Sequence, residues 1–166
     1  MVPDAYPGFE QYAGWLSIPY LVADGHPVSI RFRRPDWDGS THPAKYLSMP
    51  HEPGRIYGVS SFLGASPDLH VAEGEFDSLI LKKVFGNGIG YPGATFGRKH
   101  PHHRVLMEGF ARVFVWGDGD EAGRAFANEL AALYRNVVPI YMPSGMDVTD
   151  AYLEHGEDKL RAMVKT

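Results

Sequence analysis

Residues 112–126 read RVFVWGDGDEAGRAF, and this stretch decides how the chain folds. The apolar run 113–116 is typical of a strand buried in a sheet. The segment after it has helical spacing, with Phe126, Leu130 and Leu133 on one stripe. Between strand and helix stand two carboxylates, Asp118 and Asp120. Because buried like charges repel unless a cation compensates, the pair raises the question of what it binds.

The alternation of strand and helix extends from residue 67 to the end of the chain. We expect strands within 70–75, 87–95, 112–120 and 136–145, each followed by a helical segment, with one or two helices closing the chain. Four such units predict an α/β fold with a parallel sheet of about four strands flanked by helices. Upstream, residues 17–36 read as a β-hairpin around an Ala-Asp-Gly turn. The expected organisation is therefore a small β-rich subdomain, 1–66, and an α/β domain, 67–166.

Composition restricts the class of protein. The absence of cysteine excludes disulfides and thiolate zinc sites, and it fits a cytoplasmic protein. No apolar run approaches the roughly 18 to 20 residues that span a bilayer, and no secretory leader is recognisable, so we expect no membrane association. A formal charge of −4 argues against a bulk polyanion binder, but it is compatible with nucleic acid if the acids are clustered.

Carboxylates follow three of the four predicted strands. In open α/β sheets functional groups gather outside the carboxyl ends of the strands, so these acids are expected to converge. Without them the formal charge would change from −4 to +2. Hard divalent cations such as Mg²⁺ are the natural compensation. The candidate ligands are Glu73, Asp77, Asp118, Asp120, Asp147 and Asp150.

Each acid also has a structural interpretation. Asp120 suits a helix N-cap and Asp118 a turn, and Asp147 with Asp150 suits the start of a helix. The segment 118–129 also matches most of an EF-hand loop, but Ala122 stands where a calcium ligand is required and the preceding segment is strand-like. An EF-hand is therefore disfavoured, and capping and metal binding both stay open.

The order of these motifs resembles the Toprim domain of bacterial-type primases, topoisomerases and some nucleases. VAEGEFDSL (71–79) is similar to its first motif, which implies a catalytic Glu73 with Asp77 as companion. FVWGDGDEAGR (114–124) is similar to the second motif, which implies that Asp118 and Asp120 are metal ligands. MPSGMDVTDAYLEHG (142–156) is similar to the primase form of the last motif, which implies roles for Asp147 and Asp150.

The upstream segment resembles the tail of the basic subdomain that precedes Toprim in DnaG-type and bacteriophage primases. IPYLVADGHPVSIRFRR (18–34) and AKYLSMPHEPGRIYGV (44–59) carry this resemblance. It implies that four residues contact template or nucleotide: Arg31, Arg33, Lys45 and Tyr46. Arg98 and Lys99, in FGRKHPHHR (96–104), are further candidates for phosphate contact, with an ordinary polar loop as the alternative. Without cysteines the chain cannot carry the cysteine-ligated zinc ribbon with which such primases usually begin.

The resemblance implies RNA primer synthesis on a single-stranded DNA template from nucleoside triphosphates, dependent on Mg²⁺ or Mn²⁺. A replicative helicase or a second primase polypeptide is an expected partner, and the host cytoplasm is the expected location if the gene belongs to a phage. Two alternatives stay open: a Toprim nuclease that cleaves DNA or RNA, and a non-catalytic nucleic-acid-binding replication protein. An aspartyl-phosphate receiver is disfavoured because its acid pair belongs at the first strand.

Overall fold

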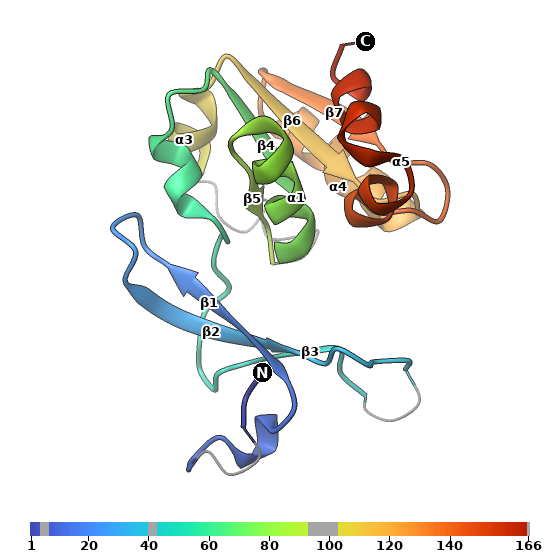
Figure 1. The fold of residues 1–166 in the computed structure, drawn as a ribbon. Coiled ribbons are helices and arrows are strands. Elements are labelled where there is room, and N and C mark those ends of the chain that lie inside the picture. Colours follow the sequence, from blue (N-terminus) through green and yellow to red (C-terminus); the bar gives the residue numbers. More distant parts are fainter. Residues whose placement is uncertain (4–6, 40–42, 93–102, 166) are drawn as a thin grey trace. The chain divides into compact units, whose positions relative to one another are not determined.

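The structure is a computed structural model that describes residues 1–3, 7–39, 43–92 and 103–165. The chain forms two compact units, Met1–Pro53 and Gly54–Thr166, drawn in Figure 1. Two residues predicted from sequence to contact phosphate, Arg98 and Lys99, lie outside the described residues. Within the described part of the chain, no helix is long and apolar enough to cross a membrane.

The first unit is a three-stranded antiparallel sheet of order β1-β2-β3. Its strands are β1 (Leu16–Leu21), β2 (Pro27–Arg33) and β3 (Tyr46–Ser48), preceded by a 3-10 turn, η1 (Glu10–Tyr12). The predicted hairpin is confirmed, and Gly25 in its turn has a φ of 92° that suits glycine. The core of the unit is aromatic: the ring of Tyr12 stacks on that of Phe32 with centroids 3.8 Å apart.

The two faces of this small sheet differ in chemistry. Phe32 is paired with Leu47 and faces the aromatic core, whereas Arg31 and Arg33 project from the opposite face because strand residues alternate. Arg33 is paired with Tyr46, and the guanidinium of Arg31 lies 4.4 Å from the centre of the Tyr46 ring. The alternation of apolar residues and arginines along β2 therefore produces a cationic face.

The second unit is a four-stranded parallel sheet of order β5-β4-β6-β7, flanked by helices. This confirms the fold class predicted from sequence. The strands are β4 (Asp68–Ala72), β5 (Ile89–Gly90), β6 (Arg112–Gly117) and β7 (Val137–Tyr141). The other elements are η2 (Val59–Leu63), α1 (Glu75–Phe85), α3 (Arg104–Glu108), α4 (Glu121–Leu133) and α5 (Val148–Met163), with a kink in α5 at Gly156.

Alternate residues of β6 pack into two separate apolar layers, one on each face of the sheet. Val113 and Val115 pack in one layer with side chains of α3 and α4. Phe114 and Trp116 pack in the other layer with side chains of α1 and α5. Figure 1 shows β6 between these helices. Because both faces are covered, the strand can be apolar throughout, which is why its sequence shows no polar alternation.

The structure differs from the sequence analysis at two points in this unit. Leu133 is 46% exposed and does not continue the buried stripe of α4, because the helix ends there and Tyr134 enters the core instead. The compact units divide at Pro53, earlier than the boundary expected near residue 66. Ile56 is buried in the core of the parallel sheet and Tyr57 forms an isolated bridge with Gly90, so this segment packs with the second unit.

A buried histidine lies within the β4–β6 pair. His70 is 4% exposed, its ring stacks on Phe85 with centroids 3.9 Å apart, and its Nδ1 accepts a hydrogen bond from Trp116 Nε1 at 3.0 Å. Burial lowers the pKa of His70 to about 3, so the imidazole is neutral. Its surroundings are apolar and aromatic, which assigns it to the core.

Candidate functional site

The carboxyl ends of three neighbouring strands bring acidic residues to one edge of the parallel sheet. Val71 of β4 is paired with Val115 of β6, so Glu73 and Asp118 follow these strands at nearly the same level. Gly117 is paired with Tyr141 at the end of β7, whose following loop leads to Asp147. The predicted convergence of the acids rests on this register.

Backbone contacts hold the acidic loop after β6 against the loop after β7. Gly119 donates its N–H to the Met146 carbonyl at 2.8 Å, and Gly145 donates its N–H to the Gly119 carbonyl at 3.1 Å. A Cβ on Gly119 would overlap the Pro143 carbonyl, and one on Gly123 would overlap the Asp118 backbone. Glycine at these positions therefore allows the backbone approach that places Asp118 and Asp120 beside the β7 loop.

Burial and mutual repulsion raise the pKa of two of the acids, Asp118 and Glu73. The pKa of Asp118 is raised to about 7 by burial and then by Asp77, Glu73, Asp147 and Asp120. Burial, followed by the charges of Asp120 and Asp77, raises the pKa of Glu73 to about 7. The carboxylates therefore lie close enough to destabilise one another's ionised forms, and a cation would relieve that penalty.

Four of the six acids use one oxygen for a hydrogen bond within the protein. Asp120 Oδ1 caps α4 by accepting from Gly123 N at 2.7 Å, so its predicted capping role is confirmed. Asp147 Oδ1 accepts from Asp150 N at 2.7 Å, and Asp150 Oδ2 accepts from Asp147 N at 3.3 Å, which forms a capping box. Asp77 Oδ1 accepts two bonds from Thr149, one from N at 2.9 Å and one from Oγ1 at 2.7 Å.

The donor set fits a hard divalent cation in its chemistry. All candidate ligands are carboxylates, and Glu73 Oε1 is buried and has no hydrogen-bond partner among the residues that the structure describes. Across the described ranges, however, no three His, Asp or Glu side chains stand at the mutual spacing of a preassembled metal site. The acids thus influence one another's charge without forming a complete coordination shell, and their assignment as metal ligands stays a prediction.

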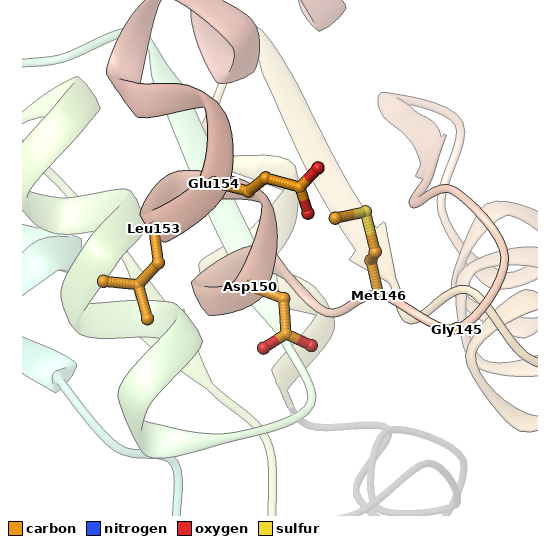
Figure 2. A pocket seen from close by; sticks show the side chains of 5 residues that line it. All are labelled: Gly145, Met146, Asp150, Leu153 and Glu154. Atoms are coloured by element: carbon orange, nitrogen blue, oxygen red, sulfur yellow. The ribbon is translucent and has the colours of Figure 1, made fainter.

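A pocket adjoins this acidic edge. It has a volume of about 530 Å³ and is open to solvent. Figure 2 shows its lining, with Asp150 and Glu154 on α5 and Met146 on the loop after β7. Asp150 thus belongs both to the pocket wall and to the predicted acidic set.

The basic residues predicted from sequence lie together in the first unit. Arg31, Arg33 and Lys45 all lie within 6.0 Å of the Tyr46 ring centre, and Lys45 Nζ lies 5.7 Å from that of Trp37. Cations and an aromatic side chain on one face can contact phosphates and a base respectively. Sequence reasoning missed Trp37, which is 37% exposed, although an aromatic residue in a polar loop was the available signal.

Comparison with known proteins identifies relatives of the chain. The Gene 57 protein of Mycobacterium phage D29 is 35% identical over 153 residues, which are 90% of this chain and 97% of the phage protein. The chain belongs to the family of this Gene 57 protein. No protein-family model matches this member of the Gene 57 family.

The Gene 57 family member also resembles primases. It is 26% identical to the DNA primase of Aquifex aeolicus (strain VF5) over 117 residues, which are 67% of this chain and 23% of that primase. The RNA polymerase domain of Mycobacterium tuberculosis primase DnaG has a TM-score of 0.73 at 24% identity, over 93% of this chain and 56% of that one. The same domain in complex with a double-stranded DNA oligomer with a 6-nucleotide overhang has a TM-score of 0.72 at 26% identity, over 91% of this chain and 52% of that one. The structural neighbours are thus primase catalytic domains, of which the chain spans about half the length.

Proposed function

We propose that the chain is the catalytic core of a primase-type nucleotidyltransferase and that its second unit is a Toprim domain. The observation that carries the proposal is the set of mutually repelling carboxylates at one sheet edge, with the pKa of both Glu73 and Asp118 raised to about 7. The similarity to the Aquifex aeolicus primase supports it, because that similarity covers 67% of the chain. The proposed reaction is RNA primer synthesis on single-stranded DNA.

In this proposal Glu73, Asp118 and Asp120 hold Mg²⁺ or Mn²⁺, assisted by Asp77, Asp147 and Asp150. When bound, the cation neutralises triphosphate charge and orients the reacting phosphorus. We propose that Glu73 accepts the proton of the attacking ribose 3′-hydroxyl, and its buried Oε1, which has no hydrogen-bond partner among the described residues, supports this role. Asp120 and Asp147 keep one oxygen each for the site while the other oxygen caps a helix.

The template and the incoming nucleotide are proposed to contact the cationic face of the first unit. Arg31, Arg33 and Lys45 supply positive charge for phosphates, and Tyr46 supplies a ring on which a base can stack. Arg98 and Lys99 remain candidates from sequence. A replicative helicase or a second primase polypeptide remains a proposed partner from the sequence resemblance.

A template-dependent assay with labelled ribonucleotides tests the proposal. The wild-type chain with Mg²⁺ or Mn²⁺ is expected to make short RNA products, and Asp118→Ala or Asp120→Ala is expected to abolish them while the circular dichroism spectrum is unchanged. The matched control is Asp158→Ala, which removes an exposed acid of α5 and should retain activity. Full synthesis by either site variant would refute the assignment.

The same assay separates the alternatives. Metal-dependent shortening of the DNA or RNA strand without any nucleotide requirement would indicate a Toprim nuclease built on the same acids. Single-strand binding without divalent-metal binding and without turnover would indicate a non-catalytic replication protein.

A further inference from the structure

Thr149 connects the acidic residue of one helix to the start of another. It is the second residue of α5, and both its backbone N–H and its hydroxyl donate to the same oxygen, Asp77 Oδ1, at 2.9 and 2.7 Å. Asp77 lies in the first turn of α1. The two residues are 72 positions apart in sequence, so these bonds join the β4–α1 connection to the β7–α5 connection.

The two carboxylate oxygens of Asp77 have different surroundings. The residue is 8% exposed, and a buried carboxylate needs donors for its lone pairs. Thr149 supplies two donors to Oδ1. The other oxygen, Oδ2, faces the Glu73–Gly74 segment, because a Cβ built on Gly74 would lie 3.5 Å from it. Asp77 can therefore offer a single oxygen toward the acidic edge.

The same bonds fix the start of α5. The first N–H groups of a helix lack partners within the helix, and here the N–H of Thr149 is satisfied by Asp77 while that of Asp150 is satisfied by Asp147. Asp147 is thus held in its capping position beside a residue that is itself tied to α1. Thr149 sets the position of acids on both sides of the contact.

We propose that Thr149 is a positioning residue of the acidic site. By occupying Asp77 Oδ1 it orients Oδ2 toward a bound divalent cation, and by tying α5 to α1 it keeps Asp147 at the same edge. The proposal rests on the proposed metal-dependent function and adds a neutral residue to the machinery that holds the metal. Hydrogen bonds of this kind, made by a ligand to its surroundings, typically contribute 10- to 100-fold to metal affinity.

The experiment measures the binding of Mn²⁺ to the full chain by titration calorimetry, in the absence of nucleotide and template. Thr149→Val removes the hydroxyl donor, keeps the backbone donor and nearly keeps the volume. Because a methyl group against a carboxylate can disturb folding, Thr149→Ala is the second variant. Thr149→Ser restores the hydroxyl. Ser60→Ala is the matched control, since it deletes an exposed hydroxyl that accepts a hydrogen bond from Lys82.

The expected result is a loss of Mn²⁺ affinity of about 10-fold or more in the Val and Ala variants, with Ser within about 3-fold of wild type and Ser60→Ala unchanged. Wild-type affinity in the Val or Ala variant would overturn the proposal, and so would an equal loss in Thr149→Ser, because then the hydroxyl bond is irrelevant. The absence of Mn²⁺ binding to the wild-type chain would overturn it as well. Since the measurement needs no turnover, failure of the chain to make RNA leaves the result interpretable and counts against the proposed function alone.

Discussion

Replacing Asp118 by asparagine should stabilise the protein when metal is absent. Asp118 has a pKa raised to about 7 in the folded chain, against an ordinary value of 3.8. A difference of about three pKa units between the folded and unfolded chain corresponds to about 4 kcal/mol in the free energy of unfolding if the whole difference contributes. Because Asp118 is only partly buried, solvent screening reduces this to about 1–2 kcal/mol. Asp118→Asn keeps the shape of the side chain and removes this cost.

The sign follows from proton linkage. Between the unfolded and folded pKa values of Asp118 the folded chain holds a proton that the unfolded chain has lost, so the contribution of Asp118 to the free energy of unfolding falls as pH rises through this window. Asparagine does not titrate. The variant should therefore be about 1–2 kcal/mol more stable than wild type at pH 8, and its advantage should shrink below about 0.5 kcal/mol at pH 4.

The assay is urea unfolding in EDTA at the two pH values, followed by tryptophan fluorescence. Asp158→Asn makes the same chemical change at an exposed position of α5 and should alter stability by less than about 0.5 kcal/mol at either pH. Added Mn²⁺ should stabilise the wild type and not Asp118→Asn. An Asp118→Asn variant that is no more stable than wild type at pH 8 would refute the argument that the ionised Asp118 carboxylate destabilises the folded chain.

Three further predictions concern the loop, the core and the cationic face. Gly119→Ala should lower the free energy of unfolding by about 2 kcal/mol or more in urea, because the new Cβ would overlap the Pro143 carbonyl. In Gly109→Ala the nearest atom to the new Cβ would be 3.4 Å away, so this control should lose much less stability. Equal losses in the two variants would contradict the prediction. The pKa of His70 is lowered to about 3 in the folded chain, so between about pH 3 and pH 6.5 the unfolded chain binds one more proton at this residue. The contribution of His70 to the free energy of unfolding should therefore fall by up to about 1.4 kcal/mol per pH unit on acidification, and the difference between wild type and His70→Gln should show this slope. Arg31→Gln should weaken the binding of single-stranded DNA in a fluorescence titration, and the slope of log binding constant against log salt concentration should become about 0.7 shallower. Lys159→Gln is the charge-matched control. An unchanged slope in Arg31→Gln would exclude a phosphate contact by Arg31.

The elements of the parallel sheet could be predicted because their signals are local. The apolar run of β6 and the helical spacing of α4 each lie within one segment, and the capping role of Asp120 follows from its place between them. The end of the α4 stripe could not be predicted, since Leu133 is exposed and Tyr134 buried only because the chain turns into the core there. Residues 56 and 57 pack with the second unit through contacts with β5, and no pattern in the neighbouring sequence predicts these contacts.

The sequence by itself determined the chemical identity of the candidate site. Its carboxylates follow strands, and parallel strands must end at one edge, so Glu73 and Asp118 could be placed together without coordinates. Only the tertiary structure decided which oxygens are already occupied and which residue occupies them. Thr149 meets Asp77 because α5 packs on α1, and Gly119 meets the Pro143 loop because β7 lies beside β6. These contacts join segments far apart in the chain, and their geometry depends on packing that no short stretch of sequence encodes.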